Sequence, residues 1–320
     1  MMHKRRNLSL AATLMGATLL LTTGCGGQSL AEASSAPAVN APVQLDQAPA
    51  EDKAAGTINA IQPNADLSAK VPQSVKDKGL KMTTSEGYPP MEMFATDGKT
   101  LVGVDPSLGR AIARKLGVKL SIANEDFNAQ IPGVTTGRYD FIMSSMTDNA
   151  KRRETVTFVD YVSAGNGFVV KKGNPAGIKS AKDVCGKTLA VVDNGSSLKL
   201  AEAMSTACTT AGSAAVNILK FPGDQEAILQ VRNGRADAGI NDYPVAAYRA
   251  QSSEGALDAV AITGDESLWG IAMKPENKDL VSAVQGALDD LIKDGSYAKI
   301  LDAWAVGQMA VKSASVNGGS

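Results

Sequence analysis

The sequence contains a single histidine, His3, and it lies within the first few residues. Residues 1–24 have the features of a cleavable export signal, so the mature chain would contain no histidine. Such a chain has neither a histidine-based catalytic triad nor a histidine-containing metal site. We therefore expect no bound metal, and nothing in the sequence indicates a cofactor.

The chain has no excess of positive charge. The full chain has 32 basic and 33 acidic residues, and removing residues 1–24 takes away three basic residues and no acidic one. The mature chain would then carry 29 basic and 33 acidic residues, a net charge of −4. No long basic run follows the N-terminus, which argues against nucleic acid as a partner.

The one long apolar run, residues 8–21, is too short to be a confident membrane span. It follows Lys4-Arg5-Arg6 and precedes Cys25, which is the order of a secretory signal over residues 1–24. The residues around Cys25 resemble a lipobox, in which the cysteine is lipidated and becomes the mature N-terminus. Thr22 departs from that pattern, where an aliphatic residue is usual, so a plain cleaved signal with an incidental cysteine stays an alternative. Residues 25–72 are rich in Ala, Pro and Ser and are predicted to form a lipid-anchored disordered tether.

A run of small polar residues follows a predicted buried strand at residues 139–143. It contains Ser145 and Thr147, and Arg152 lies five residues beyond Thr147. Hydroxyls, free backbone N–H groups and a guanidinium suit a carboxylate, because guanidinium binds it through two parallel hydrogen bonds. Neighbouring Arg153 is expected to face solvent. A polar loop with a solvated basic helix start is the alternative interpretation.

The pattern Ile-x-x-Val-x-x-Gly-Arg-x-Asp occurs twice, at residues 131–140 and again 97 residues later at residues 228–237. Each copy reads as a helix end, a turn and a buried strand, and the same offset relates Ser145 to Asp242. Ligands of open α/β sheets bind beyond the carboxyl ends of the strands. Two such lobes would place Arg152 and Asp242 on opposite walls of one cleft, where a free amino acid could satisfy both. Asp242 as a helix cap before Pro244 is the alternative.

These segments resemble the family 3 extracellular solute-binding proteins, the amino-acid receptors of ABC importers. The resemblance covers roughly residues 75 to 306, and its further segments are Gly87-Tyr88-Pro89-Pro90, Leu101-Val102-Gly103-Val104-Asp105, Phe158-Val159-Asp160-Tyr161, Trp269-Gly270-Ile271-Ala272 and Asp294-Gly295-Ser296-Tyr297. It implies an α/β, two-lobed periplasmic-binding-protein-like fold of type II, each lobe a doubly wound sheet, with two hinge crossings. The expected bounds are 73–166 and 263–307 for lobe 1, 167–262 for lobe 2, and 308–320 for a disordered tail.

The resemblance also implies further pocket residues. In the family, the position of Phe127 lines the pocket, and the loop with Ser196 and Ser197 resembles a Gly-Thr-Thr segment whose hydroxyls and helix N-terminus suit a ligand carboxylate. Tyr88, at a strand end, could stack on the ligand or pack on the neighbouring prolines. Tyr88, Phe127 and Tyr243 suggest an apolar or aromatic lining, but they do not specify which amino acid binds.

Cys185 and Cys208 remain as an even pair if Cys25 carries lipid, and export places the chain in an oxidising compartment. We expect a disulfide between them, with two buried free thiols as the alternative.

Three functions compete. The first is a monomeric receptor that binds an amino acid and hands it to a membrane permease. The second is an enzyme on the same scaffold, since the resemblance also reaches cyclohexadienyl dehydratase-like proteins, although no residue pair stands out as a general acid and base. The third is a ligand-sensing surface lipoprotein without a permease.

Overall fold

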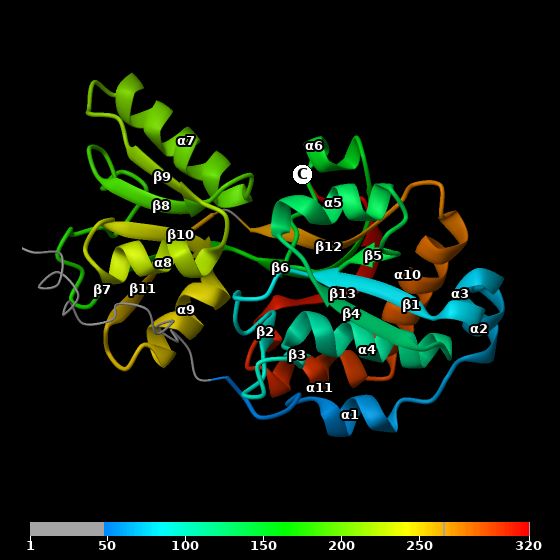
Figure 1. Ribbon diagram of the computed structural model, residues 1–320. Helices are drawn as coiled ribbons and strands as arrows, with labels where there is room; N and C mark the ends of the chain where they lie inside the picture. Colours follow the sequence, from blue (N-terminus) through cyan, green and yellow to red (C-terminus); the bar gives the residue numbers. More distant parts are fainter. Residues whose placement is uncertain (1–47, 265, 320) are drawn as a thin grey trace, which may run out of the picture. The chain divides into compact units, whose positions relative to one another are not determined.

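The computed structural model describes residues 48–264 and 266–319, and these form two α/β lobes with separate sheets (Figure 1). Lobe 1 has the sheet order β13-β6-β12-β5-β1-β4 and lobe 2 the order β11-β7-β10-β8-β9. In lobe 1, β1 pairs in parallel with β4 and β5, whereas β6, β12 and β13 pair antiparallel with their neighbours. In lobe 2, β8 pairs in parallel with β9 and β10, and β7 pairs antiparallel with β10 and β11.

The elements of lobe 1 before the first crossing are α1 (Ala55–Ala60), α2 (Ala65–Lys70), α3 (Gln73–Lys78), β1 (Leu80–Thr84), β2 (Met93–Phe94), β3 (Leu101–Val102), α4 (Val104–Leu116), β4 (Leu120–Asn124), α5 (Phe127–Thr135), β5 (Phe141–Ile142), α6 (Ala150–Arg153) and β6 (Thr157–Ala164). Lobe 2 comprises β7 (Asn166–Lys171), β8 (Thr188–Val192), α7 (Ser196–Thr210), β9 (Asn217–Phe221), α8 (Asp224–Arg232), β10 (Ala238–Asp242), α9 (Tyr243–Ser252) and β11 (Leu257–Ala261). Lobe 1 is completed by β12 (Ser267–Met273), α10 (Lys278–Lys293), α11 (Ser296–Ala303), a 3-10 turn (Gly307–Met309) and β13 (Ala310–Val316).

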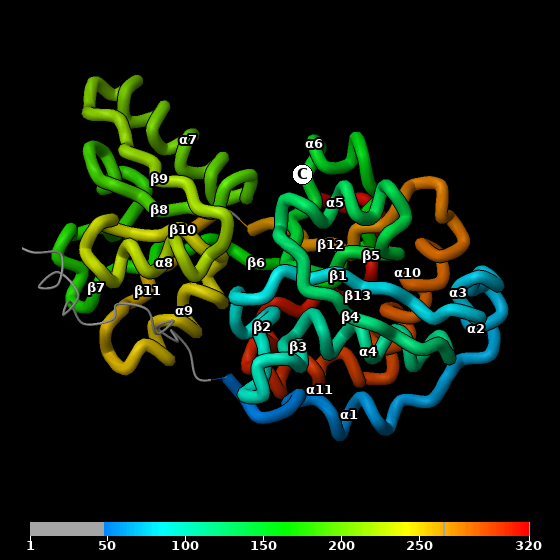
Figure 2. The backbone as a smooth tube through the Cα atoms, in the orientation of Figure 1, coloured from blue at the N-terminus to red at the C-terminus, as the bar shows by residue number. Residues whose placement is uncertain are grey.

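The chain crosses between the lobes twice, from β6 to β7 and from β11 to β12. Figure 2 shows the result by colour: the stretch from the later greens through yellow, residues 166–261, forms one lobe, and the blue-to-green start joins the orange-to-red end in the other. Both faces of each sheet are covered. In lobe 1, α4, α10 and α11 bury one face and α5 the other; in lobe 2, α7 buries one face and α8 and α9 the other. The two-lobed, doubly wound architecture with two hinge crossings is therefore as predicted.

The internal repeat has a physical basis in both lobes. Gly137 and Gly234 both adopt positive φ, at 77° and 72°, where a side chain would be strained. Three residues after each glycine, an aspartate carboxylate accepts the backbone N–H that begins the neighbouring strand: Asp140 from Lys81 at 2.8 Å, and Asp237 from Thr188 at 2.8 Å. The two copies thus join corresponding strands, and β5 and β10 hold corresponding places in their sheets.

Two expectations about the ends of the fold are wrong. The tether was expected to run to residue 72, but Ile58, Ile61 and Leu67 are buried in the lobe 1 core from α1, α2 and the segment between them. The prediction missed them because alanine and proline surround these few large apolar residues, so the sequence shows no clear helical periodicity. Residues 308–320 were expected to be disordered, but β13 pairs with β6 at the edge of the sheet. Long-range pairing overrides the weak local preferences of this polar segment. Residues 1–24 and Cys25 lie outside the described residues.

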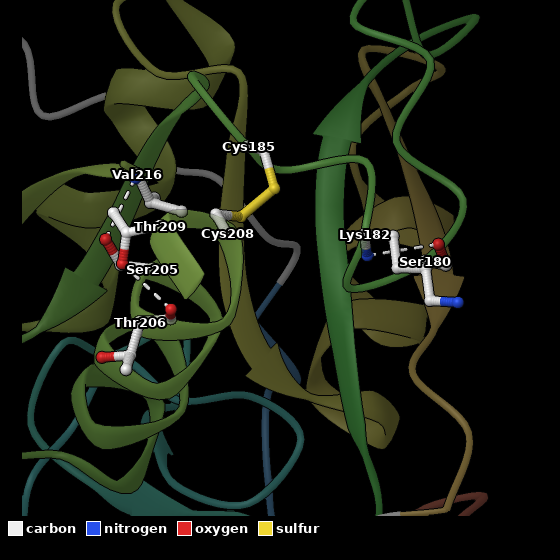
Figure 3. Close-up of a disulfide and its surroundings, with 8 residues drawn as sticks. All are labelled: Ser180, Lys182, Cys185, Ser205, Thr206, Cys208, Thr209 and Val216. Carbon is white, nitrogen blue, oxygen red and sulfur yellow. Dashed lines mark hydrogen bonds between the residues drawn. A yellow bond between two sulfur atoms is a disulfide. The ribbon is translucent and has the colours of Figure 1, made fainter. Parts of the chain in front are cut away.

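Lobe 2 contains the predicted disulfide between Cys185 and Cys208, whose Cα atoms are 5.5 Å apart (Figure 3). It joins the loop before β8 to the last turn of α7, and the backbone N–H of Val216 donates to the Ser205 hydroxyl on the same helix. The bond therefore fastens the end of α7 to the edge of the lobe 2 core.

Within the described ranges, no helix combines the length and apolar character that a membrane span requires. The same ranges contain no group of three or more His, Cys, Asp or Glu side chains arranged to hold a metal ion.

Candidate functional site

A pocket of about 80 Å³ is lined by residues from both lobes. The structure brings together in its wall all eight side chains predicted to bind ligand: Tyr88, Phe127, Ser145, Thr147 and Arg152 from lobe 1, and Ser196, Ser197 and Asp242 from lobe 2. The predicted aromatic Tyr243 is not in the wall; it is 40% exposed and packs on Gly167. The roles of the eight side chains in binding stay predictions.

Arg152 is held by its own loop and faces across the pocket. Its Nη1 donates to the Thr147 carbonyl at 2.9 Å, and its Nη2 lies 3.4 Å from the Asn194 carbonyl of lobe 2. The guanidinium sits 5.3 Å from the ring centre of Phe127, a cation–π distance. Burial lowers the pKa of Arg152 to about 10, against the opposing effect of Asp242. No carboxylate is bonded to the guanidinium among the described residues, which leaves donors for an anion.

Asp242 ends β10 on the other wall. The Tyr88 hydroxyl donates to its Oδ2 at 2.6 Å, so a lobe 1 phenol bonds a lobe 2 carboxylate. Asp242 precedes the first residue of α9, but its side chain makes no capping hydrogen bond, which argues against the helix-cap alternative. Burial raises the pKa of Asp242 to about 7, while the Tyr88 bond partly opposes the rise. A ligand cation would favour the ionised form.

Ser145 was expected to present a free hydroxyl to the ligand, and its surroundings differ from that expectation. Its backbone N–H donates to Asp105 Oδ2 at 2.7 Å, and its hydroxyl lies 3.2 Å from Glu92 Oε2. Tyr161 donates to the other oxygen of Asp105 at 2.7 Å. Burial raises the pKa of Glu92 and of Asp105, and proximity to Asp105 raises the pKa of Glu92 further. Ser145 therefore joins a buried carboxyl pair to the pocket wall.

The pocket wall also contains Thr147 and the first residues of α7. Thr147 forms an isolated β-bridge with Trp269, which fixes the loop against β12. Ser196 and Ser197 are the first two residues of α7, a 15-residue helix whose first N–H groups face the pocket end of lobe 2. A helix N-terminus favours a carboxylate through these unpaired N–H groups. The start of α7 and the Arg152 side chain thus line the same pocket from the two lobes.

The expectation that Arg153 faces solvent is wrong. Its side chain is 22% exposed and its Nη1 donates to the carbonyl of Gly319 at 2.7 Å, with Asp148 at 3.4 Å. The expectation failed because the partner segment, after β13, was itself expected to be disordered. Arg153 is thus a structural residue of lobe 1.

Sequence reasoning missed an ion pair behind the pocket. Arg249, 1% exposed, is 2.6 Å from Asp224 through its Nη2 and also donates to the Gly87 carbonyl of lobe 1. Asn241 donates to the other oxygen of Asp224 at 2.7 Å. Asp224 lines the pocket, so the pair links the pocket wall to the inter-lobe contact.

Two of the missed residues carried a signal. Asp105 was named within a segment of the family resemblance and was given no role in the site, yet its carboxylate is fully buried near the start of α4. Glu92 stands among apolar neighbours in the printed sequence, and a carboxylate there indicates a specific partner. Asp224 and Arg249 are 25 residues apart in the sequence and have no local signature.

Comparison with known proteins agrees with this architecture. The sequence profile of the bacterial extracellular solute-binding proteins, family 3, matches residues 80–307. The arginine-binding protein ArgT of Corynebacterium glutamicum is 30% identical over 261 residues, which cover 80% of this chain and 84% of ArgT. The L-cystine-binding protein TcyJ of Escherichia coli K12 is 28% identical over 235 residues, covering 72% and 84%.

Among solved structures, an ancestral amino-acid-binding protein described as a precursor of cyclohexadienyl dehydratase superposes with a TM-score of 0.65 at 30% identity. The match covers 72% of this chain and 98% of that protein. These relatives bind amino acids, and the profile covers most of both lobes. The chain belongs to the bacterial extracellular solute-binding proteins, family 3.

Proposed function

We propose that this chain captures an amino acid outside the cell by lobe closure and delivers it to an ABC importer. The observation that carries the proposal is that Arg152 and Asp242, from different lobes, line one pocket. Arg152 would bind the α-carboxylate, with Thr147 and the N-terminus of α7 adding hydrogen bonds. Asp242 would bind the α-ammonium. A ligand that contacts both lobes stabilises their closed arrangement, because it binds that arrangement better than the open one.

The Tyr88 hydroxyl competes with the ligand for Asp242. In the structure it occupies the Oδ2 atom that an ammonium would approach. Ligand entry would therefore exchange a neutral donor for a charged one, which adds the attraction between opposite charges to the hydrogen bond. Tyr88 then keeps its ring against the ligand, the role that its position at a strand end suggests.

The charge of the pocket favours a ligand with a cationic side chain. Its wall contains the carboxyl groups of Glu86, Glu92, Asp224 and Asp242, and the only basic side chain among its lining residues is Arg152. Arg249 neutralises Asp224 from behind. Asp242 is assigned to the α-ammonium and Glu92 is engaged in the buried pair with Asp105, which leaves Glu86 for a second cation. Because the C. glutamicum relative is named as an arginine-binding protein, L-arginine is the first candidate.

Glu86 is placed to face such a side chain. Burial raises its pKa, with Glu226 adding to the rise, and Gln225 of lobe 2 donates to its Oε2 at 3.2 Å. A guanidinium bonded to Glu86 would lower the pKa again and would neutralise this half-buried carboxyl group. A neutral side chain would do neither.

We also propose that the mature chain is a monomer held at the outer face of the cell membrane by lipid on Cys25. The support is the order of charged, apolar and Gly-Cys segments in the first 25 residues. Two acyl chains suffice for stable anchoring, whereas one is marginal.

A screen of the twenty amino acids and L-cystine by thermal shift, followed by calorimetry, tests the proposal. A ligand at a hundred times its Kd should add about 2.7 kcal/mol of stability. We expect L-arginine to give the largest shift and neutral amino acids to give less. If no amino acid shifts the transition, the receptor function is wrong. Recovery of a chemically altered amino acid after incubation would instead support the enzyme alternative.

A further inference from the structure

Residues 310–319 extend lobe 1 beyond the family match, which ends at residue 307. β13 adds an edge strand beside β6, with Ser315 opposite Asp160 and Val316 opposite Val159. Helix α10 fastens the same strand, because Asp289 accepts the Ala314 N–H at 2.8 Å and Gln285 donates to the Ala314 carbonyl at 3.1 Å. The segment is thus a built part of the lobe.

The chain turns sharply after β13. Asn317 adopts a positive φ of 53°, a conformation that asparagine tolerates better than most residues. Its backbone N–H and side-chain Oδ1 both bond to the backbone of Phe158, at 3.1 and 2.9 Å. The turn directs Gly318 and Gly319 away from the sheet edge and toward the loop that precedes α6.

Two glycines then close against buried carboxylates. The N–H of Gly318 donates to Asp160 Oδ2 at 2.9 Å, and the N–H of Gly319 donates to Asp148 Oδ2 at 2.8 Å. A Cβ on Gly319 would overlap the Asp148 carbonyl oxygen, a backbone atom, whereas one on Gly318 would meet side-chain atoms, Ser315 Oγ at 2.5 Å and Asp160 Oδ2 at 2.9 Å. Close approach of the backbone therefore requires glycine at position 319.

Both ends of the Arg152 loop are held in this way. Asp148 follows Thr147, whose carbonyl accepts from Arg152, and Arg153 follows Arg152. Arg153 donates to the carbonyls of Gly319, at 2.7 Å, and Asn317, at 3.2 Å. Residues 317–319 therefore bond to the residue after Thr147 and to the residue after Arg152.

The loop is fixed at its start by the Thr147 bridge to Trp269, but its helical part has little packing of its own. Helix α6 has four residues and none of them is buried, so neither its length nor its packing holds it. Asp148 is fully buried and lies near Asp160, whose pKa is raised by burial and further by Asp148. Donors from the Gly318 and Gly319 backbone offset the cost of placing these two carboxylates together.

We propose that residues 317–319 form a C-terminal hook that holds the loop 147–153 so that Arg152 points into the pocket. Gly319 and Arg153 are then positioning residues for the ligand carboxylate. The inference rests on the proposed function, since it assumes that Arg152 binds ligand. Supporting groups that are held loosely let a binding group drift from its productive geometry, and affinity falls although no ligand contact is removed.

The test compares Gly319→Ala with Ser313→Ala, an exposed position in the preceding strand β13. L-arginine affinity is measured by calorimetry, and hydrogen exchange is measured over residues 147–153, both far below the melting temperature. We expect Gly319→Ala to weaken binding about two- to thirtyfold, the range for residues that act through a network, and to speed exchange in this loop. Ser313→Ala should change neither.

A double variant shows whether Gly319 acts on binding through Arg152 or only stabilises the lobe. If the hook acts through Arg152, Gly319→Ala should weaken binding in the native background but add no loss to Arg152→Ala. Arg153→Ala removes the hydrogen bonds to the Gly319 and Asn317 carbonyls without introducing a steric clash, and it should weaken binding as Gly319→Ala does. It replaces Gly319→Ala in the test if Gly319→Ala does not fold. Unchanged affinity in both single variants overturns the hook. If the native protein binds no amino acid, the proposed function fails, and unchanged exchange over residues 147–153 then overturns the hook on its own.

Discussion

The Tyr88 hydroxyl and the Asp242 carboxylate meet at 2.6 Å across the two lobes. The Asp242 backbone N–H also lies 3.2 Å from the same hydroxyl, so the phenol engages the strand end as well as the side chain. One lobe 1 residue thus holds the group assigned to the ligand ammonium. Binding is consequently an exchange of partners at Asp242.

Arg152→Ala should lower affinity for the amino acid by about 2–5 kcal/mol, because the ligand carboxylate loses a charged partner and stays buried. Arg153 is not a neutral control, since it binds the hook. Lys151, whose side chain is 74% exposed, is the matched control, and Lys151→Ala should bind as the native protein does. Calorimetry on the two variants decides, and equal losses would contradict the assignment.

Asp242→Asn should change how stability depends on pH. The pKa of Asp242 is about 7 in the folded chain against an ordinary value of 3.8, so the folded state binds more protons than the unfolded state between these values. The contribution of Asp242 to the free energy of unfolding therefore falls as pH rises through this window. Asparagine does not titrate. The melting temperature of Asp242→Asn relative to the native protein, both without ligand, should rise from about pH 5 to about pH 8.

A pH-independent difference would show that Asp242 is not buried as a carboxylate in the ligand-free protein. A helix cap predicts a different result, because asparagine caps a helix about as well as aspartate, so Asp242→Asn would then change the melting temperature little at neutral pH. The same variant should lose most of its affinity for the amino acid.

Arg249→Ala should destabilise the protein by about 3–5 kcal/mol, because removing one partner of a buried ion pair leaves an uncompensated charge on Asp224. Urea unfolding measures the loss. Arg235, an exposed arginine in the same lobe, provides the control, and Arg235→Ala should change stability little. A loss below about 1 kcal/mol for Arg249→Ala, the size expected of a surface ion pair, would refute the buried pairing.

Removing the disulfide by changing Cys185 and Cys208 to serine should cost about 3 kcal/mol in the chain-entropy model, given their separation of 23 residues. Intact mass with and without reductant tests the bond directly. A native protein whose mass is the same under both conditions carries free thiols instead.

Cys25→Ala should release the protein from membranes or stop its processing, because lipidation needs the thiol. Cell fractionation measures this. A variant that still sediments with membranes to the native extent would exclude Cys25 as the anchor.

The lobe repeat and the site walls were predictable from sequence because each depends on local patterns. The two Gly-Arg-x-Asp turns each predict a following strand, and ligands of α/β sheets bind beyond the carboxyl ends of the strands. Arg152 and Asp242 could be singled out because they follow those ends. The sequence spacing then placed them in different lobes.

The rest depends on contacts that have no local signature. Asp105 bonds to Ser145 over 40 residues, and Arg153 bonds to Gly319 over 166 residues. Each group looks like an ordinary polar residue until its distant partner is placed. β13 was missed for the same reason, since its stability comes from pairing with β6. N-terminal residues 54–71 were missed because alanine and proline conceal their buried aliphatic positions.

Arg152 and Asp242 are proposed to bind the two charged ends of one α-amino acid. Calorimetry can test each contact separately with L-arginine, with agmatine, which lacks the carboxylate, and with 5-guanidinopentanoate, which lacks the ammonium. We expect Arg152→Ala to weaken binding of L-arginine strongly but of agmatine hardly at all, and Asp242→Asn to weaken binding of L-arginine strongly but of 5-guanidinopentanoate hardly at all. If each variant weakens all three compounds equally, neither residue contacts the group assigned to it.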